Sequence, residues 1–347
     1  MCSRPPSLAR RWCVATIGSR EAGCSDSHGR CQLAAGRGSS QGRDIEVSGA
    51  DFKQADSMKI IAVTNIKGGV GKTTTAVNLS YLCAASGRPT LLWDLDPQGA
   101  ATYTLRGEPL ERASAKKLLA GKRHLPELVL STGYPNLDLL PADFSYRNFD
   151  VHLSERKRPT ERLLKMSRSL REVYSALFLD CAPGISLLSE NVLRAADAII
   201  VPLLPTPLSV RMLAQLRDFI IGEGWVDLML LPFFSMVDRR KSLHHDIIAN
   251  TREQFPTMLA TEVPYWSEIE RMSLRRAPIP AFAPSGPAAQ IYSALWTEVA
   301  ARMGTSQSAV ARLESGDADL RLSTLERYAA ALGQRLDWKL SLRPLED

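Results

Sequence analysis

The chain has 347 residues, 45% of them hydrophobic and 23% charged, which is enough for one large core domain and a small module. Prolines such as Pro202, Pro205 and Pro207 interrupt the longest apolar stretches, so no run of about 20 apolar residues could cross a bilayer, and we expect a soluble α/β protein. The net charge of +6 suits a polyanionic partner but is also compatible with an ordinary arginine-rich surface.

Residues 1–57 are rich in Ser, Gly and Arg and have almost no periodic apolar pattern. We expect a disordered extension, because this segment has too little apolar surface to bury, and it lacks the continuous apolar region of a secretory signal. The alternative is an arginine-bearing arm that contacts DNA or a membrane. Four of the six cysteines lie here at spacings unlike a zinc site, and Cys83 and Cys181 are expected to be small core residues.

A glycine-rich loop follows the first apolar run. The run 60–63 predicts a strand, the segment 67–74 has the sequence KGGVGKTT, and the stretch 75–82 is typical of a helix. Glycines allow successive backbone N–H groups to face a phosphate, and the following helix adds its positive N-terminal end. We expect Lys72 to contact the β- and γ-phosphate oxygens and the Thr73 hydroxyl to bind Mg²⁺. The expected phosphate-binding residues are Gly68, Gly69, Val70, Gly71, Lys72, Thr73 and Thr74.

The loop departs from the ordinary phosphate-binding pattern at two positions. Ile66 replaces the first glycine, and Lys67 is a second lysine at the loop's entry. With these features the chain resembles the ParA/MinD family of dimerising ATPases, whose loop is called a deviant Walker A motif. The resemblance implies ATP and Mg²⁺ as cofactors, an ATP-dependent homodimer, and a Lys67 that reaches the partner's phosphates. The alternative is a glycine turn that happens to be flanked by lysines.

Two carboxylates follow the second apolar run. Gly87 and Pro89 are expected to end the first helix, the run 91–93 predicts a buried strand, and Asp94 and Asp96 follow it. Residues at i and i+2 of an extended chain point the same way, so both carboxylates can face a metal–phosphate cluster. The segment 94–99 resembles the family's second ATPase motif, which implies that Asp96 orients the attacking water and that Asp94 supports the Mg²⁺ shell and the loop. The alternative is a pair of solvated acids in a turn.

Further apolar runs predict three more strands. The run 176–180 ends in Asp180 and resembles the Walker B strand, which implies that Asp180 holds a water of the Mg²⁺ shell. The run 198–201 follows a helical segment, 188–194, and resembles the family's next core strand. The run 230–238 resembles the strand and loop that lie near the base in relatives. It contains no guanine-reading motif, so the resemblance favours adenine.

The C-terminal segment changes character. Residues 296–304, 307–316 and 322–333 predict three short helices with glycine stops, and the first two are joined by a tight turn. This pattern resembles the Cro-like (phage-repressor, XRE-type) helix-turn-helix, which implies DNA contacts by Gln307, Ser308 and Arg312. Such modules usually begin with an additional helix, and here its place is taken by 287–295, the expected closing helix of the ATPase. The alternative is a packing appendage whose polar residues are merely solvated.

Beyond Gly333 the chain alternates between apolar and polar residues, which predicts a strand. MinD-type relatives hold the membrane with a C-terminal amphipathic helix, and a strand disfavours that function. We therefore expect no membrane partner.

These patterns predict a doubly wound, mainly parallel α/β P-loop NTPase with a small α-helical C-terminal module. The expected parts are an extension at 1–57, which could precede the natural start, an ATPase domain at 58–296 and a tail at 297–347. The resemblance implies a ParA-like ATPase that binds DNA, hydrolyses ATP slowly in plasmid or chromosome partitioning, has a ParB-like partner, and lies in the bacterial cytoplasm on the nucleoid. The alternatives are an ATP-switched transcriptional regulator that uses the tail, and a MinD-like membrane positioner.

Overall fold

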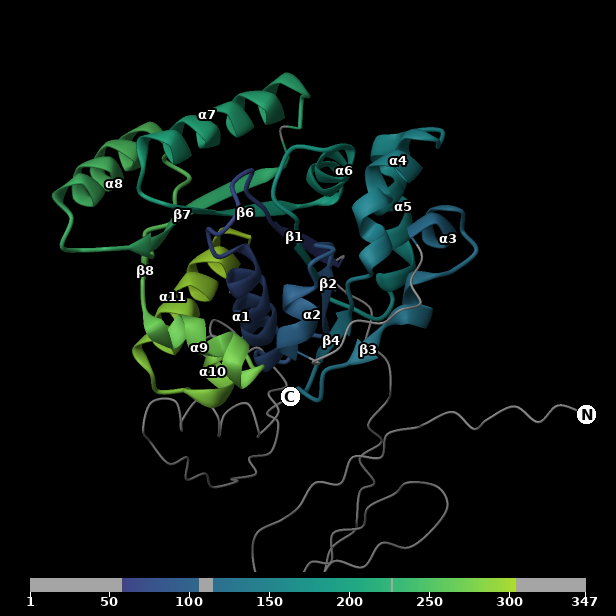
Figure 1. Cartoon of the computed structure of the whole chain (residues 1–347), viewed down its shortest axis with the longest axis horizontal. Coiled ribbons are helices and arrows are strands. Elements are labelled where there is room, and N and C mark those ends of the chain that lie inside the picture. The colour runs from purple at the N-terminus through teal and green to yellow at the C-terminus, as the bar shows by residue number, and fades with distance from the viewer. Residues whose placement is uncertain (1–57, 106–114, 226, 304–347) are drawn as a thin grey trace, which may run out of the picture. The chain divides into compact units, whose positions relative to one another are not determined.

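The computed structural model describes residues 58–105, 115–225 and 227–303. Eight strands of these residues form one sheet in the order β3-β4-β2-β5-β1-β6-β7-β8 (Figure 1). Every neighbouring pair is parallel except β3 and β4. The strands are β1 (Lys59–Val63), β2 (Thr90–Asp94), β3 (Leu130–Ser131), β4 (Leu137–Leu140), β5 (Ala176–Asp180), β6 (Ala198–Leu203), β7 (Met229–Val237) and β8 (Val263–Pro264).

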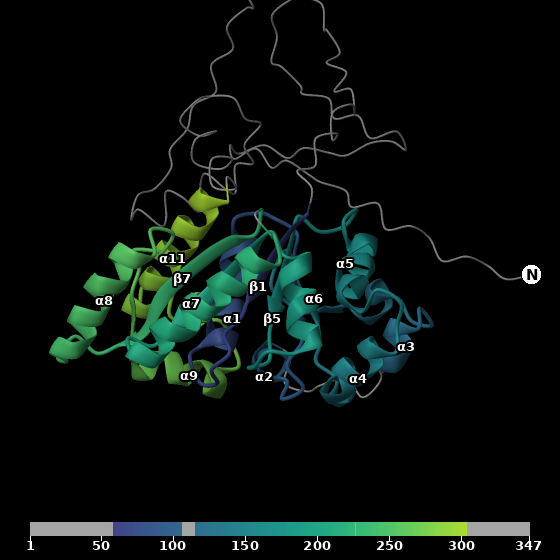
Figure 2. The ribbon, with the colours of Figure 1, turned by 90° about the horizontal axis from the view of Figure 1, so that it is seen from above.

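Helices cover both faces of the sheet. Figure 2 shows α6, α7 and α8 in front of the strands. The α-helices are α1 (Lys72–Ala85), α2 (Ala100–Leu105), α3 (Ala115–Leu119), α4 (Phe149–Ser154), α5 (Arg162–Ser167), α6 (Leu187–Ala195), α7 (Pro207–Gly222), α8 (Ser242–Gln254), α9 (Ser267–Arg275), α10 (Ile279–Phe282) and α11 (Pro287–Arg302). Short 3₁₀ helices are η1 (Leu125–Leu128), η2 (Phe144–Asn148), η3 (Pro159–Glu161) and η4 (Arg168–Leu170).

Each face of the sheet has its own hydrophobic core. Residues of α3 to α8 pack against one face together with Ile60 and Ala62, and residues of α1, α2 and α9 to α11 pack against the other with Ile61 and Val63. The strands β2, β5 and β6 are buried along their whole length. Burial on both faces is the reason for their continuous apolar sequences, because a parallel sheet between two helix layers exposes neither side to water.

The fold predicted from the sequence is confirmed. The apolar runs at 60–63, 91–93, 176–180 and 198–201 lie in β1, β2, β5 and β6, and the segment 188–194 lies in α6. The run 230–238 lies in β7 except for its last residue, Asp238, which follows the strand. The strand β1 is central, with β5 on one side and β6 on the other. The loops that follow β1, β2 and β5 therefore leave the same carboxyl edge of the sheet, where open α/β sheets bind ligands.

The last described helix crosses a predicted boundary. α11 is continuous from Pro287 to Arg302, so the predicted division between 296 and 297 falls within it. The proposed DNA-contacting residues Gln307, Ser308 and Arg312, and the predicted strand after Gly333, lie outside the described residues. The predicted extension at 1–57 also lies outside them. In the described part of the chain, no helix has the length and apolar character needed to span a membrane.

Candidate functional site

The loop between β1 and α1 has the backbone geometry of a phosphate cradle. Gly69 and Gly71 have φ angles of 69° and 91°, in the left-handed region where a Cβ is strained. At Gly71, which directly precedes α1, an added Cβ would also lie 3.2 Å from the hydroxyl of Ser235. Glycine is therefore required at these turns, and the loop leads directly into the N-terminus of α1.

Two side chains hold this loop in shape. The buried Asn65 accepts a hydrogen bond from the backbone N–H of Lys67 at 2.9 Å and donates one to the carbonyl of Pro202 at 2.7 Å. The Lys72 ammonium donates to the carbonyl of Lys67 at 3.0 Å, so its side chain folds back across the loop. Burial lowers the pKa of Lys72, and the nearby carboxylates of Asp180 and then Asp96 oppose that shift. The ammonium is thus hydrogen-bonded to the loop and lies in the electrostatic field of two acids.

Asp94 and Asp180 are neighbours at the ends of β2 and β5, where they are paired in register. Both are completely buried. Asp94 accepts hydrogen bonds from the Thr102 backbone N–H at 2.8 Å and hydroxyl at 2.7 Å, and from the Asp96 N–H at 3.2 Å. Burial raises its pKa to about 6. These bonds fix the loop from Asp94 to α2, and the role of Asp94 in the Mg²⁺ shell and the loop stays a prediction.

Asp180 is buried without such support. Its two carboxylate oxygens make no hydrogen bond of good geometry within the described ranges, although the Thr73 hydroxyl lies close enough to lower the pKa of Asp180. Burial, followed by the charge of Asp94, raises the pKa of Asp180 well above its ordinary value, and the hydroxyl of Thr73 and the ammonium of Lys72 partly oppose this. A buried carboxylate with unsatisfied oxygens is costly, and a cation with its bound water removes that cost.

The donors around Asp180 suit Mg²⁺. Within the described ranges, no three His, Cys, Asp or Glu side chains group together as metal ligands, so a protein-only cage is absent there. Mg²⁺ usually keeps several waters and binds through one or two protein oxygens plus phosphates. The Thr73 hydroxyl and the Asp180 carboxylate fit that requirement. Metal roles for Thr73, Asp94 and Asp180 remain predictions.

Asp96 lies in the loop after β2, near Lys72 and Asp180. It is half-buried, and its carboxylate accepts a hydrogen bond from the Gln98 N–H at 2.9 Å, which tightens the turn after β2. Its charge acts on both Lys72 and Asp180. The fold thus brings together residues that the sequence singled out, from the start of α1, the loop after β2 and the end of β5, while their individual roles stay predictions. They are Lys72, Thr73, Asp96 and Asp180.

A cavity of about 550 Å³ adjoins the phosphate loop. One wall is formed by Gly71, Thr73 and Thr74. The other walls come from α2, the end of β7, the β8–α9 region and α11, through Gln98, Gly99, Ala100, Tyr103, Thr104, Ser235, Met236, Val263, Pro264, Tyr265, Trp266, Ile269, Glu270, Met272, Ser273 and Tyr292. Sequence reasoning missed the aromatic members of this wall. The only local signal is the pair Tyr265 and Trp266 directly after a short strand.

An irregularity in β7 shapes this cavity. The pairing of β7 with β8 shifts register between Ser235 and Val237, and Met236 between them has a φ of 55°. Such a backbone is strained for a residue with a side chain, and β-bulges are common beside functional sites. The bulge places Ser235 and Met236 in the cavity wall close to Gly71.

The buried side chain of Asn78 connects the phosphate-loop helix to the opposite wall. Its amide donates to the Thr74 carbonyl at 2.8 Å and to the Met272 sulfur at 3.3 Å. Its carbonyl accepts from the backbone N–H of Ile279 at 2.8 Å. One residue of α1 therefore holds α9 and α10 in place beside the cavity.

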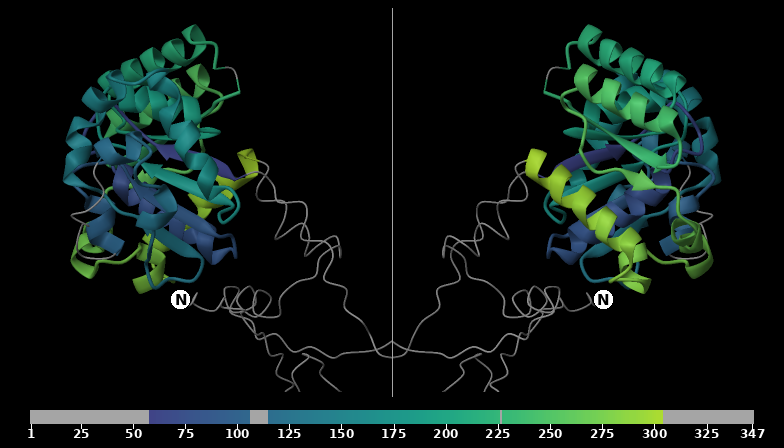
Figure 3. Two further views of the ribbon diagram at one scale, coloured as in Figure 1. Left: turned by 90° about the vertical axis from the view of Figure 1, so that its right-hand side faces the viewer. Right: turned by 90° about the vertical axis from the view of Figure 1, so that its left-hand side faces the viewer.

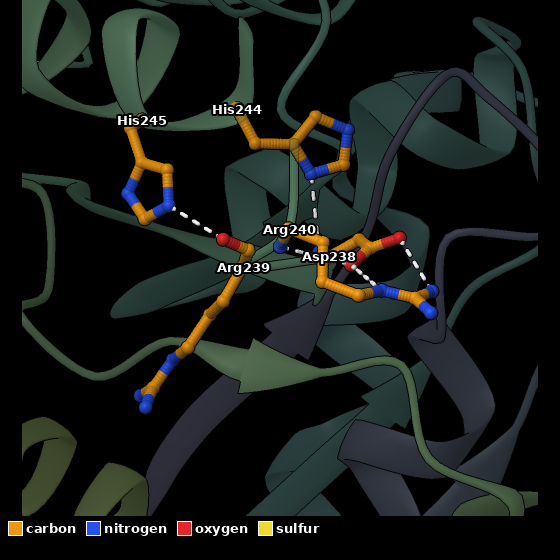
Figure 4. Close-up of polar contacts among 5 residues, drawn as sticks. All are labelled: Asp238, Arg239, Arg240, His244 and His245. Atoms are coloured by element: carbon orange, nitrogen blue, oxygen red, sulfur yellow. Dashed lines mark hydrogen bonds and ion pairs between the residues drawn. The ribbon is translucent and has the colours of Figure 1, made fainter. Parts of the chain in front are cut away.

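A basic loop follows β7 at the same edge of the sheet. Asp238 accepts two hydrogen bonds from the Arg240 guanidinium, at 2.9 and 3.0 Å, and its N–H donates to His244 at 3.1 Å (Figure 4). The ring of His245 lies 2.8 Å from the carbonyl of Arg239, whose side chain extends away from the group. Burial, followed by the charge of Lys241, lowers the pKa of His244, and its Nδ1 is the acceptor of the hydrogen bond from the Asp238 N–H.

The two predicted core cysteines are confirmed. Cys83 and Cys181 are free and buried, and each belongs to one of the two hydrophobic cores. Burial raises the pKa of Cys83 to about 11 and that of Cys181 further. A thiol that stays protonated is a poor metal ligand and nucleophile, so both act as small apolar residues.

Comparison with known proteins agrees with this geometry. A family model described as an AAA domain matches residues 58–222, and a second, described as a helix-turn-helix, matches residues 292–339. The chromosome partitioning protein ParA of Caulobacter vibrioides is 33% identical over 208 residues, which are 58% of this chain and 78% of the relative. The sporulation initiation inhibitor protein Soj of Bacillus subtilis is 31% identical over 252 residues, which are 70% of this chain and 98% of the relative.

A solved structure shows the same fold. The cobyrinic acid a,c-diamide synthase from Mycobacterium smegmatis with bound ADP and magnesium is 26% identical, with a TM-score of 0.61 over 73% of this chain and 97% of that chain. The similarity to Soj supports the family assignment more strongly, because it covers nearly the whole length of Soj. This chain belongs to the ParA/Soj branch of the ParA/MinD family of P-loop ATPases, and it has a helix-turn-helix segment at its C-terminal end.

Proposed function

We propose that this protein is a partition-type ATPase that binds Mg²⁺ and ATP, dimerises on ATP, holds DNA and hydrolyses ATP slowly. The observation that carries the proposal is the unpartnered, buried Asp180 carboxylate beside Lys72 and Thr73 at the end of a phosphate loop. Metal-free, this arrangement is electrostatically unfavourable, and a magnesium–nucleotide complex supplies the missing positive charge and the hydrogen-bonding water.

Each residue of the site has a proposed task. Backbone N–H groups of 68–74 would surround the β-phosphate, and the Lys72 ammonium would contact the β- and γ-oxygens. Thr73 and Asp180 would hold Mg²⁺ directly or through water, and Asp94 stabilises the loop that carries Asp96. Asp96 orients the attacking water, because it is the half-buried acid nearest to solvent in this group.

Lys67 has a different proposed task. The Lys67 carbonyl accepts a hydrogen bond from the Lys72 ammonium. The Lys67 side chain itself is half-buried and begins at the N-terminal end of the loop. A lysine in this position can reach phosphates bound by a second copy of the chain. A cation added from the partner stabilises charge on the transferring phosphoryl group, and it makes hydrolysis depend on dimerisation.

DNA is the proposed partner of the ATPase body, and the basic loop after β7 is its proposed contact surface. Arg239, Arg240 and Lys241 are exposed there. Figure 4 shows the two arginines together with His244 and His245. Cationic side chains on one surface bind phosphates without reading sequence. A ParB-like partner that stimulates hydrolysis, and a location on the bacterial nucleoid, belong to the same proposal through the ParA relative.

A direct test compares Lys67→Ala with the wild type in analytical ultracentrifugation and in ATP titrations. The variant should bind Mg·ATP but stay monomeric and inactive, because its own phosphate loop is intact. Lys165→Ala on the exposed surface of α5 is the matched control and should dimerise normally. An ATP-dependent dimer formed by Lys67→Ala would refute the proposed task of this lysine.

A second variant separates binding from hydrolysis. Asp96→Ala should accumulate as an ATP-bound dimer with prolonged residence on DNA, because it loses a contribution made in the transition state and keeps the bound ground state. Single-turnover hydrolysis and DNA dissociation are the measurements. Normal turnover by this variant would assign the water-orienting task to another residue, and Asp94 would be tested next.

The match of residues 292–339 to a helix-turn-helix model favours a second candidate, an ATP-switched transcriptional regulator. The two functions differ in their response to salt. Affinity for random DNA falls steeply with salt concentration for any sequence, whereas an operator retains a large specificity ratio. Equal binding to random and selected DNA at all salt concentrations would remove the regulator.

A further inference from the structure

The hydroxyl of Thr102 lies where three parts of the ATPase domain meet. Thr102 is on α2 and is completely buried, with an exposed fraction of 0%. Its hydroxyl oxygen accepts a hydrogen bond from the backbone N–H of Ala142 at 2.8 Å and donates one to Asp94 at 2.7 Å. Ala142 follows β4, toward the side of the molecule that carries α3, α4 and α5 (Figure 1; Figure 3, left). One buried hydroxyl therefore connects α2 to the end of β2 and to the segment after β4.

The direction of these two hydrogen bonds is fixed. A backbone N–H can only donate, so the Thr102 oxygen is the acceptor for Ala142 and the hydroxyl hydrogen is free to point at Asp94. The Thr102 backbone N–H donates to the same carboxylate oxygen of Asp94, Oδ2, at 2.8 Å. The last side-chain torsion of an aspartate is otherwise broad. Two donors on one oxygen therefore hold the Asp94 carboxylate in a single orientation.

That orientation acts on the position of the next acid. The other oxygen of Asp94, Oδ1, accepts the backbone N–H of Asp96 at 3.2 Å, which is long for such a bond. Because the bond is long, it depends on the direction in which Oδ1 points. The Asp96 carboxylate in turn accepts a hydrogen bond from the Gln98 N–H at 2.9 Å. A chain of hydrogen bonds thus runs from Ala142 through Thr102 and Asp94 to Asp96.

We propose that Thr102 is a positioning residue for hydrolysis: its hydroxyl orients Asp94, and Asp94 then holds Asp96 where it aligns the attacking water. This inference rests on the water-orienting task proposed for Asp96. A displacement of a catalytic group by about 1 Å costs on the order of 100-fold in rate, so a residue that acts only through its neighbours can control turnover. The bonds of the Thr102 hydroxyl run to Asp94 and Ala142 and not to the phosphate loop, so nucleotide affinity should not depend on them.

Single-turnover hydrolysis by the full-length variants Thr102→Val and Thr102→Ser tests the proposal. Valine has nearly the shape of threonine without its hydroxyl, and serine keeps the hydroxyl. Thr102→Val should hydrolyse bound ATP about 10- to 100-fold more slowly, which is the usual cost of losing an outer hydrogen-bond partner at a metal site. Its affinity for Mg·ATP, measured by isothermal titration, should equal that of the wild type. Thr102→Ser should restore most of the rate.

A matched control is available on α8. Thr251 is also a buried helical threonine, with an exposed fraction of 1%, and its hydroxyl bonds to the carbonyl of Ile247 within the same helix at 2.6 Å. Thr251→Val therefore removes a buried hydroxyl without touching the chain of bonds to Asp96, and its rate should equal that of the wild type.

A double variant and hydrogen exchange separate positioning from a general loss of structure. Thr102→Val should slow hydrolysis in the wild-type background and add nothing to the residual rate of Asp96→Ala, because residues that act through one another are not additive. In the nucleotide-free protein, the amide of Asp96 should exchange faster in Thr102→Val and at the wild-type rate in Thr102→Ser. Protected amides in β1 and β5 show that the domain is folded, and Thr102→Ala, with the same expected loss of rate, is the second variant if valine disturbs them.

A loss of rate that depends on Asp96 and that serine restores supports the positioning task. Wild-type turnover in Thr102→Val, an equal further loss in the Asp96→Ala background, or a fall in Mg·ATP affinity that accounts for the slower rate would overturn it and leave the proposed ATPase in place. A wild-type protein that binds Mg·ATP without hydrolysing it would instead refute the proposed function, and the positioning task with it.

Discussion

The sheet presents acids at two places along its carboxyl edge, and these acids are in opposite electrostatic states. Asp94 and Asp180 at the centre are completely buried, and burial raises the pKa of both. Asp238 near the β8 end is paired with Arg240, whose hydrogen bonds hold the pKa of that carboxyl well below its usual range. The half-buried Asp238 is already paired with a cation, and the buried pair has too little positive charge around it.

The difference between these acids follows from where the fold places them, at buried strand ends or in a loop that solvent reaches. Parallel strands buried on both faces force the residues at their ends into a low-dielectric setting, where a charge interacts strongly with its neighbours. On the exposed loop after β7, solvent screens the same type of residue, and its ion pair contributes little to stability. The effects of substitutions on stability should therefore differ in size between the two places. For the acids, these effects should also differ in sign.

The largest effect is expected from Lys72→Ala. The variant removes the cation nearest to Asp180 and the predicted phosphate contact, and truncation of one partner of a buried charge pair costs about 2–5 kcal/mol. Isothermal titration with Mg·ATP should show nucleotide binding reduced by that amount or lost. Wild-type affinity in Lys72→Ala would exclude the phosphate loop as the nucleotide site.

Asp180→Asn should stabilise the nucleotide-free protein. A neutral amide in place of an unsatisfied buried carboxylate removes a penalty of about 1–3 kcal/mol, so the melting temperature should rise. The additional stabilisation by Mg·ATP should disappear with the metal-binding oxygen. Asp238→Asn is the contrasting variant and should not raise the melting temperature. A fall in the melting temperature of Asp180→Asn would show that the buried acid is already satisfied.

The contributions of Asp94 and Asp238 to stability should change with pH in opposite directions. Asp94 has a folded pKa of about 6 and an ordinary unfolded value near 4, so its contribution to stability is fully present below about pH 4 and is lost as pH rises through 6. The nucleotide-free protein should therefore gain stability from this region on mild acidification. Asp238, with a lowered pKa, contributes above its unfolded value and loses that contribution in acid.

Chemical denaturation of the nucleotide-free wild type and Asp94→Asn between pH 4 and 7 measures this term. The difference between the two proteins should grow from about pH 4 to about pH 6 and level off above that. A difference that is independent of pH would mean that Asp94 keeps the same charge throughout the range.

The smallest effect is expected from Arg240→Ala. The Arg240 side chain in this ion pair is largely exposed to solvent, so thermal unfolding should be unchanged within error. DNA binding should weaken uniformly across sequences if this loop contacts phosphates, and its salt dependence should become less steep. A large loss of thermal stability would show that the exposed pair supports the fold, and the contrast between the two regions would then be wrong.

The local sequence was enough to predict the phosphate loop and the acids at the centre of the site. Apolar runs that end in Asp94 and Asp180, and a glycine loop between a strand and a helix, are contiguous patterns with a direct physical reason. A parallel strand delivers the residue after it to the carboxyl edge, so the meeting of Lys72, Asp96 and Asp180 follows once the strands are recognised.

Tertiary structure alone decided the remainder. Tyr103, Trp266 and Tyr292 share one cavity wall although they come from α2, the β8–α9 region and α11, and no local pattern relates segments so distant in the chain. Sequence also treated Asp94 and Asp180 as similar acids. Only the packed structure shows that Thr102 satisfies the first and that no described residue makes a hydrogen bond of good geometry to the second, because hydrogen-bond satisfaction depends on which groups the fold brings within about 3 Å.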